Sequence, residues 1–302
     1  MIKIGIIGLG DIAQKAYLPI ISKRNVEVHL YTRNDDTLSH LSNLYRFRNI
    51  HHSLESLIDS GIKGAFVHSS TPSHQPIIDQ LLSHDVHVYV DKPITYDFKS
   101  SEKLVIKAEQ RNRILMVGFN RRYAPSCQML KQLDDPNMIV MQKNRTSLPG
   151  DVRAFIFDDF IHVIDTLLYL FPYPIENLII NGRKKGDQLY HVTVQFVSAE
   201  GATAIGIMNR DSGTVEERIE VFTSKEKRVS CNLSDVFIHQ NKTETKLPSD
   251  DWGTTLHKRG FEQIIDDFLL AVSSGTASPL AKSNILLSHK ICEQVVEKLD
   301  AL

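Results

Sequence analysis

A glycine-rich turn near the first residue constrains the fold of this chain more than any other feature. The apolar run IKIGIIG at 2–8 leads into Gly8-Leu9-Gly10-Asp11-Ile12-Ala13, which fits the pattern GxGxxG/A and opens a helical stretch. In a strand–turn–helix unit, the first glycine permits a tight turn and the second lets the backbone approach a pyrophosphate, which the free N–H groups of the helix start bind. The alternative is a turn that merely contains glycines. We predict a dinucleotide site that uses Gly8, Gly10, Asp11 and Ile12.

Up to about residue 120, short β-branched runs alternate with helical stretches. Strands that are buried on both faces and alternate with helices are typical of a parallel sheet. We therefore expect a doubly wound α/β domain, a Rossmann fold, over residues 1–120. Its strands are expected at 2–8, 26–32, 64–70, 86–91 and 114–119, and its helices at 11–23 (with a kink at Pro19), 36–46, 53–59, 74–84 and 97–111.

After about residue 120, runs of alternating polarity follow one another, separated by Gly, Asp, Ser or Lys. This meander predicts a mainly antiparallel sheet, and hence an α+β domain over residues 121–302. The strands are expected at 138–144, 177–182, 189–197, 202–208, 217–224, 227–233 and 236–241, and the helices at 158–170, 255–272 and from Ser283 to Leu299.

The charge balance and the cysteine count exclude several classes of protein. Lys and Arg number 35 and Asp and Glu number 36, so the net charge is −1 and we expect neither nucleic acid nor a membrane surface as a partner. No run approaches the ~18 apolar residues of a membrane helix. The three cysteines are far apart in the sequence, which argues against a disulfide framework and a metal site. The apolar start is short and lacks a cleavage site, so we expect no signal peptide and a cytoplasmic protein.

The second expected strand ends in Thr32-Arg33-Asn34, and this ending bears on the choice of cofactor. NAD sites usually carry Asp or Glu about 20 residues after the glycines, bonded to the ribose 2′-hydroxyl. Thr32 cannot repel a 2′-phosphate and Arg33 can pair with one, so we predict that NADP is preferred over NAD. In the alternative, Arg33 is a surface residue and Asp35 or Asp36 reaches the ribose.

Three further loops follow the carboxyl ends of expected parallel strands, where ligands of open α/β sheets bind. They carry Ser70-Thr71-Pro72, Asp91-Lys92-Pro93, and Gly118-Phe119-Asn120-Arg121-Arg122-Tyr123-Ala124-Pro125. A Lys at such an edge, here Lys92, points at the cofactor crevice.

These motifs together resemble the glucose–fructose oxidoreductase / inositol dehydrogenase / MocA family. Asp91-Lys92-Pro93 resembles its Glu-Lys-Pro, residues 118–125 resemble Gly-Phe-x-x-Arg-Phe/Tyr-x-Pro, and Asp158 to Asp165 resemble Asp-x-Gly-x-His-x-x-Asp. The sequence segments DKPI, GFNRRYAP and DDFIHVIDTL are most similar to those of the MviM-like "virulence factor" branch. The chain differs from the family in Pro76, where a His is usual after Thr-Pro, and in Phe160, where Gly is usual.

The resemblance implies a Rossmann domain followed by a domain with a large open sheet. It also implies that the loops hold the cofactor through Ser70, Thr71, Pro72, Asp91, Lys92, Asn120 and Arg122. For Arg121 a surface ion pair is expected instead.

A narrow polar stripe interrupts the apolar stretch 157–171. Asp158, His162 and Asp165 lie at i, i+4 and i+7, which share one face of a helix. The stripe could face solvent, but the resemblance favours a cleft. His162 has an ordinary pKa near 6.5 and can accept a hydroxyl proton; Asp158 can orient its ring or simply favour the helix N-terminus. Lys92 can stabilise a developing alkoxide, while Asp165 is either a substrate contact or a structural residue.

We therefore expect an NAD(P)-dependent oxidoreductase with Lys92, Asp158 and His162 as catalytic residues. The substrate implied by the resemblance is a secondary alcohol or ketone of a sugar, sugar derivative or cyclitol. One alternative is a glycosidase of the same fold that recycles bound NAD; another is a regulator that senses the cofactor without catalysis. An open sheet usually covers one face with a second subunit, so we expect a homodimer or higher homo-oligomer.

Overall fold

The structure is a computed structural model that describes residues 1–248 and 252–301, and it divides into two compact units. Unit 1 comprises residues 1–118 and 261–286, and unit 2 comprises residues 119–260 and 287–302. The first division lies within two residues of the expected boundary at 120. Residues 261–286, which sequence reasoning placed in the second domain, instead complete the first unit.

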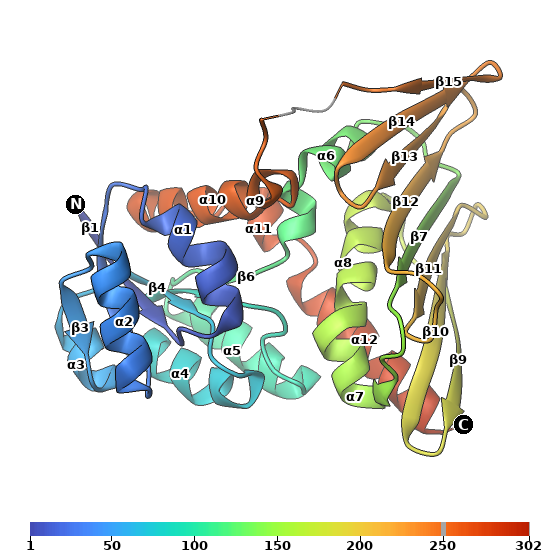
Figure 1. Cartoon of the computed structure of the whole chain (residues 1–302). Helices are drawn as coiled ribbons and strands as arrows, with labels where there is room; N and C mark the ends of the chain where they lie inside the picture. The colour runs from blue at the N-terminus through green and yellow to red at the C-terminus, as the bar shows by residue number, and fades with distance from the viewer. Residues whose placement is uncertain (249–251, 302) are drawn as a thin grey trace. The chain divides into compact units, whose positions relative to one another are not determined.

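Unit 1 is built on a six-stranded parallel sheet with the order β3-β2-β1-β4-β5-β6 (Figure 1). The order reverses between β1 and β4, which are paired in register from Ile4↔Gly64 to Ile7↔Val67. This doubly wound topology confirms the predicted Rossmann fold. The strands are β1 Ile2–Ile7, β2 Val26–Tyr31, β3 Asn49–His51, β4 Gly64–Val67, β5 His87–Val90 and β6 Leu115–Val117.

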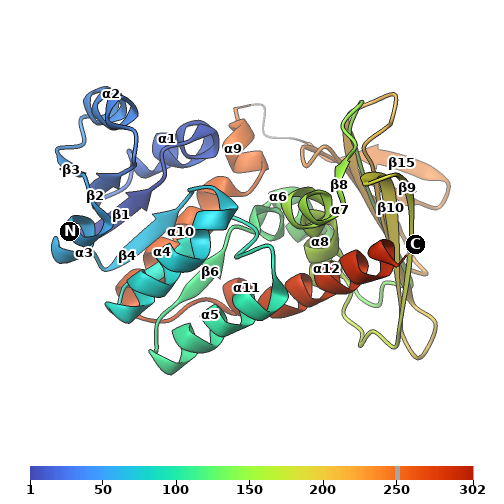
Figure 2. The same cartoon turned by 90° about the horizontal axis from the view of Figure 1, so that it is seen from below.

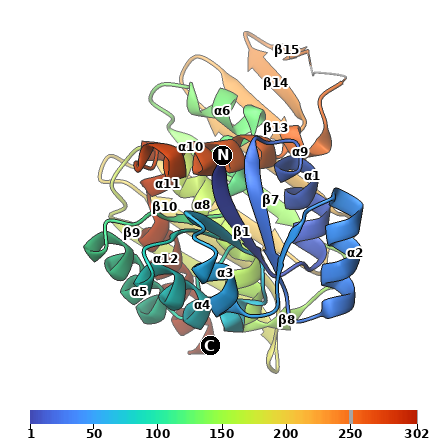
Figure 3. The ribbon, with the colours of Figure 1, turned by 90° about the vertical axis from the view of Figure 1, so that its left-hand side faces the viewer.

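Helices cover both faces of this sheet, and glycines in the strands let them approach closely (Figure 3). A Cβ on Gly64 would lie 2.8 Å from Val272 and one on Gly5 would lie 2.9 Å from Ile62, on opposite faces. The helices are η1 Ala13–Tyr17, α1 Leu18–Ile21, α2 Asp35–Tyr45, α3 Leu54–Asp59, α4 Thr71–Ser83, α5 Phe98–Gln110, α10 Phe261–Ser274 and α11 Pro279–Lys282. At Leu18, one residue before the Pro19 where a kink or a break was expected, a π-helical turn gives way to an α-helix.

Unit 2 is built on a nine-stranded mixed sheet with the order β15-β14-β13-β12-β7-β11-β10-β8, in which β9 also pairs with β10. Most pairs are antiparallel, as expected, but β7 and β11 are parallel from Thr203↔Met138 to Asn209↔Asn144. The strands are β7 Met138–Asn144, β8 Gly150–Asp151, β9 Asn177–Lys185, β10 Gln188–Val197, β11 Thr203–Asn209, β12 Glu216–Phe222, β13 Lys227–Cys231, β14 Asp235–Gln240 and β15 Thr243–Lys246.

Helices pack against one face of this sheet, and in the described part of unit 2 the opposite face carries none (Figures 1 and 2). A Cβ on Gly206 of β11 would lie 2.8 Å from both Val163 and Leu167, so this glycine allows close packing of the central helix. The helices are η2 Asn120–Tyr123, α6 Pro125–Lys131, α7 Val152–Phe155, η3 Ile156–Phe160, α8 Ile161–Leu170, α9 Thr255–Lys258 and α12 Ile285–Asp300.

Two kinds of difference from the expected elements have simple causes. Strands β3, β8 and β15 were missed because they are short and largely polar. The expected helix 255–272 is two helices, divided at Gly260, where φ is +79° and a Cβ would lie 2.2 Å from the Asn120 carbonyl oxygen. Within the described residues no helix is both long and apolar enough to cross a membrane.

Candidate functional site

The helix starts in unit 1 differ in how their N–H groups are satisfied. Helices α2, α3 and α5 are capped by side chains, since Asn34, Ser53 and Asp97 each accept a hydrogen bond from a backbone N–H of the first turn. The helices that follow β1 and β4 have no side-chain cap. These two strands flank the point where the strand order reverses, which is where open α/β sheets bind ligands.

The glycine turn between β1 and η1 has the geometry of a phosphate cradle. Gly8 has φ +83°, and a Cβ there would lie 2.5 Å from the backbone nitrogen of Ser69, so no other residue fits. A Cβ on Gly10 would meet nothing within 4 Å, which leaves space against the backbone. Asp11 is exposed and pairs with Lys15 at 2.7 Å, while Ile12 leads into the helix. The open cradle and the uncapped N–H groups fit a dinucleotide pyrophosphate.

The residues after β2 differ in whether their side chains are already engaged. Arg33 is exposed and forms no ion pair with the described residues. Asn34 is engaged as the cap of α2, through the N–H of Thr37 at 2.8 Å. Asp35 lies in the first turn of α2 and pairs with His52 at 3.0 Å, so its carboxylate already has a partner.

A buried histidine ties together the two loops that carry Ser70-Thr71-Pro72 and Asp91-Lys92. His74 of α4 has Nδ1 3.0 Å from the Pro93 carbonyl oxygen and Nε2 3.0 Å from the Ser69 carbonyl oxygen. Lys92 is half-buried, and its backbone N–H donates to the Asp91 carboxylate at 2.9 Å. His74 therefore fixes the backbone on which Lys92 stands.

A second histidine at this edge, which sequence reasoning missed, is buried without a partner. His68 follows β4 and is 5% exposed, and neither ring nitrogen has a hydrogen-bond partner in residues 1–248 and 252–301. Its ring packs on Tyr17 with centroids 3.8 Å apart. Burial, together with repulsion from the neighbouring His74, lowers the pKa of His68 to about 3, so the ring is neutral. The only signal in the sequence was a His at the end of an otherwise apolar strand.

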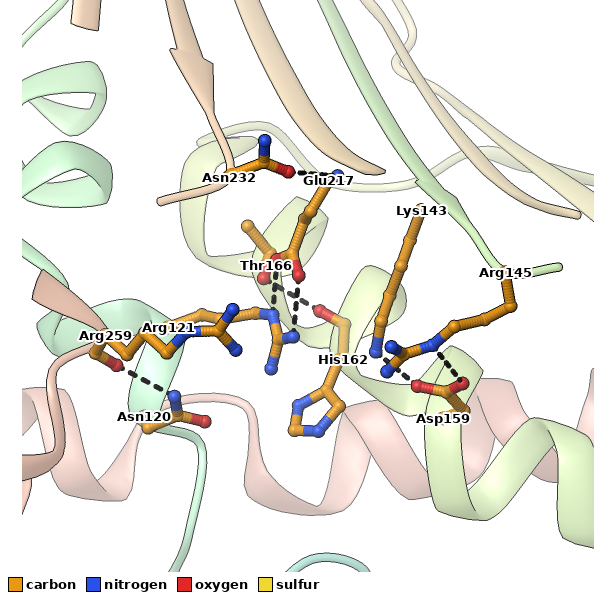
Figure 4. Close-up of polar contacts among 10 residues, drawn as sticks. All are labelled: Asn120, Arg121, Lys143, Arg145, Asp159, His162, Thr166, Glu217, Asn232 and Arg259. Atoms are coloured by element: carbon orange, nitrogen blue, oxygen red, sulfur yellow. Dashed lines mark hydrogen bonds and ion pairs between the residues drawn. The ribbon is translucent and has the colours of Figure 1, made fainter. Parts of the chain in front are cut away.

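In unit 2, the predicted polar stripe divides into two parts. Asp158 lies in the π-helical turn η3 and His162 in the first turn of α8, and both are half-buried. The His162 carbonyl oxygen accepts a hydrogen bond from the Thr166 hydroxyl at 2.7 Å (Figure 4). Asp165 is 1% exposed and instead faces the interior of the unit.

Asp165 and Arg122 form a closed ion pair in that interior. Arg122 donates to Asp165 through Nε at 2.9 Å and through Nη2, and the Ser288 hydroxyl donates to the same carboxylate at 3.0 Å. Burial raises the pKa of Asp165, and Arg122 opposes that shift. The two candidate ligand-binding residues are thus bonded to each other. Asn120 is also engaged, since its amide nitrogen donates to the Arg259 carbonyl oxygen at 2.8 Å.

A cluster of charges that sequence reasoning did not foresee surrounds the helix of His162 (Figure 4). Arg121 pairs with Glu217 through two hydrogen bonds of 2.6 and 2.8 Å; the ion pair was expected, but its surface position was wrong because both side chains are buried. Asp159 binds Lys143, and Arg210 and Arg145 lie 3.1 and 3.6 Å from it.

Burial and ion pairing oppose each other in this cluster. Burial, with repulsion from Arg121, lowers the pKa of Lys143 to about 7, against the opposing attraction of Asp159 and Glu217. Burial raises the pKa of Glu217, but Arg121 outweighs it and holds the pKa at about 2. Burial likewise opposes ionisation of Asp159, yet Lys143 and the two arginines hold its pKa well below the ordinary value. Among the described residues, no group of three or more His, Cys, Asp or Glu is placed to hold a metal ion.

Comparisons with known proteins find matches for both parts of the chain. Residues 2–119 match the family described as "Oxidoreductase family, NAD-binding Rossmann fold", and residues 125–241 match "YceM-like, C-terminal domain". The chain is 31% identical over 301 residues to "Putative oxidoreductase YceM" of Salmonella typhimurium, covering 97% of this chain and 96% of that one. It is 24% identical to myo-inositol 2-dehydrogenase of Thermotoga maritima over 267 residues, 78% of this chain and 77% of that one.

A solved structure has nearly the same fold along its whole length. The dehydrogenase MviM from Clostridium difficile superposes with a TM-score of 0.93 at 30% identity, covering 98% of this chain and 99% of that one. The likeness extends over both units, and so over the glycine cradle and the helix that carries His162.

Proposed function

We propose, from the premise that this chain belongs to the oxidoreductase family with an NAD-binding Rossmann fold, that it is an NADP-preferring dehydrogenase of a sugar or polyol. The observation that carries this proposal is the uncapped, glycine-lined helix start where the strand order reverses. By contrast, helices α2, α3 and α5 of the same unit are capped by the side chains of Asn34, Ser53 and Asp97. The sugar or polyol is supported by the relative named for myo-inositol.

The preference for NADP rests on the residues after β2. Arg33 presents an exposed guanidinium, and the nearby Asp35 is already paired with His52. A 2′-phosphate would gain a bidentate partner in Arg33 and would meet no acidic side chain at Thr32. NADP should therefore bind more tightly than NAD.

The chemistry assigned to the remaining residues follows from their types. The cofactor, when bound, accepts a hydride from the carbon that bears the substrate hydroxyl. In the proposed reaction, His162 takes the proton of that hydroxyl and becomes an imidazolium, which Asp158 orients and stabilises. Lys92 donates a hydrogen bond to the same oxygen as alkoxide character develops, on a backbone that His74 holds. Ser70, Thr71, Pro72 and Asp91 line the cofactor edge, whereas Arg122 and Asp165 support the fold.

The test combines calorimetry with an absorbance assay at 340 nm. NADP should bind at least ten-fold (about 1.4 kcal/mol) tighter than NAD, and Arg33→Ala should remove the difference. In a screen of polyols and sugars, His162→Ala should lower turnover about 10²- to 10⁴-fold with NADP affinity unchanged. Absence of nucleotide binding would overturn the proposal. Tight binding with no net reduction would point to a recycling glycosidase or to a sensing role.

We also propose that unit 2 forms a homo-oligomer, most simply a dimer, through the helix-free face of its sheet. In the described residues that face carries no helix, and sheets of this kind bury such a face against a second subunit (Figure 1). A monodisperse monomer at micromolar concentration in light scattering would contradict this.

A further inference from the structure

The parallel pairing of β7 and β11 brings two arginines to one edge of the second sheet. The strands end together at Asn144 and Asn209, and Arg145 and Arg210 follow directly. The two outgoing loops are bonded to each other: the Leu148 N–H donates to the Arg210 carbonyl oxygen at 2.7 Å, and the Ser212 N–H donates to that of Arg145 at 3.0 Å. The arginines therefore stand on a fixed backbone.

The charges at this edge are unbalanced. Asp159 is the single carboxylate shared by Lys143, Arg145 and Arg210, and within the described chain these cations pair with no other acid. Even with Lys143 neutral, two guanidinium groups face one carboxylate. An excess of positive charge at a partly buried site is costly unless an anion completes it.

Both arginines also have donors to spare. Arg145 is 40% exposed at its side chain and makes no hydrogen bond to the described residues, because Asp159 lies 3.6 Å away. Arg210 is anchored over the Phe155 ring at 4.2 Å and bonds Asp159 through Nη2, but its buried Nε has no partner in the part of the chain described. Planar forks held in this way match the oxygens of a carboxylate or a phosphate.

The position of the edge relates it to the proposed catalytic residue. Asp159 precedes His162 by three residues on consecutive helical turns, η3 and α8 (Figure 4). Arg145 and Arg210, which lie against Asp159, are therefore placed beside the same short helical segment that carries His162.

We infer that Arg145 and Arg210 form an anion subsite, and that the substrate is a sugar or polyol bearing a carboxylate or phosphate group. The inference rests on the proposed function for the identity of the reacting site, and on the two arginines alone for the charge of the ligand. Lys143 and Asp159 position the arginines and do not contact the anion.

The experiment compares three compounds that share one ring: D-glucose, D-glucuronate and D-glucose 6-phosphate. Each is titrated by calorimetry into the NADP-loaded protein and into the variants Arg145→Gln and Arg210→Gln. At least one anionic compound should bind ten-fold or more tightly than glucose, and Arg145→Gln should remove that advantage while leaving the affinity for glucose and for NADP unchanged. The carboxylate and phosphate arms identify which anion is preferred.

The matched control is Arg183→Gln, an exposed arginine on β9 of the same unit, which should change no affinity. Arg145→Gln keeps the test valid if Arg210→Gln fails to fold, because Arg145 is the more exposed of the two. Equal binding of all three compounds, equal weakening of all three in Arg145→Gln, or no binding of either anionic compound would overturn the subsite. Turnover of a neutral polyol that depends on His162 would then preserve the proposed function without it, whereas loss of NADP binding would remove the proposed function itself.

Discussion

Two arginine–aspartate contacts in unit 2 differ in how completely their charges are matched. Arg122 and Asp165 are each 1% exposed, match one to one, and have Ser288 as a third partner. Asp159, by contrast, is shared by Lys143, Arg145 and Arg210, and donors on both arginines remain unused. We call the first contact closed, because its charges are matched one to one. We call the second contact open, because donors on its arginines remain unused and a ligand can bind them.

The same distinction holds between two histidines of unit 1. Both nitrogens of His74 face carbonyl oxygens, so the ring links two loops, whereas neither nitrogen of His68 has a partner in the described chain. Closed groups should therefore matter most to stability, and open groups to ligand binding.

The largest expected effect is on the closed ion pair. Asp165→Ala leaves the Arg122 guanidinium buried without its carboxylate, which should lower the free energy of unfolding by about 3–5 kcal/mol. Denaturant titration measures this change. The matched variant of the open contact, Arg145→Gln, should cost less than about 0.5 kcal/mol. Similar losses in the two variants would erase the distinction.

The closed histidine should give the next largest effect. His74→Leu removes the ring that lies between the Ser69 and Pro93 carbonyl oxygens and leaves at least one of them without its N–H donor, at a cost of about 1–3 kcal/mol. Because the link also fixes the backbone at Lys92, turnover should fall with little change in NADP affinity. His68→Leu, at the open histidine, should be nearly neutral for stability, since it removes no hydrogen bond within the described residues. The comparison fails if His68→Leu is the more destabilising of the two.

Lys143 allows the open cluster to be tested by pH. Its pKa is lowered to about 7, from an ordinary 10.5, chiefly by burial. Between these values the unfolded chain binds a proton that the folded chain does not, so stability due to this group rises as pH increases from about 7 toward 10 and the penalty is full below 7. The difference in unfolding free energy between the wild type and Lys143→Met should therefore rise by up to about 1.4 kcal/mol per pH unit in this range. A pH-independent difference would show that Lys143 stays charged, fully matched by Asp159.

Sequence patterns identified the elements whose signals are local in the chain, such as buried strands and the glycine turn. They missed the pairings between residues that are far apart in the chain. The strands of unit 1 were recognisable because parallel strands buried on both faces give continuous apolar runs, and the glycine motif marks its own turn. The parallel pairing of β7 with β11 left no trace, because alternation along a strand is the same for either direction of its neighbour. The partner of Arg121 is Glu217, 96 residues away, and nothing local indicates it.

The polar stripe divides because its helix is not a regular α-helix. An i, i+4, i+7 spacing assumes a regular α-helix, but Asp158 lies in a π-helical turn, which carries an extra residue and rotates the face that follows. Asp158 and His162 are consequently half-buried while Asp165 points inward to Arg122. The same turn places Asp159, which the sequence analysis did not single out, against Lys143.

The smallest expected effect concerns the helix starts of unit 1. Ser53 caps α3 by accepting a hydrogen bond from the Ser56 N–H at 3.0 Å, whereas Ser70 precedes α4 without such a bond. Ser53→Ala should cost about 1 kcal/mol and Ser70→Ala close to nothing in the absence of nucleotide, as measured by denaturant unfolding. With NADP at 100 times its dissociation constant from the wild-type protein, every variant whose affinity for NADP is unchanged should gain about 2.7 kcal/mol. A smaller gain for Ser70→Ala alone would mean that Ser70 contacts the nucleotide, because a start that the chain leaves uncapped is stabilised only by what binds there. An equal cost for both substitutions without nucleotide would instead show that α4 is capped by the chain itself, and the contrast between closed and open helix starts would be lost.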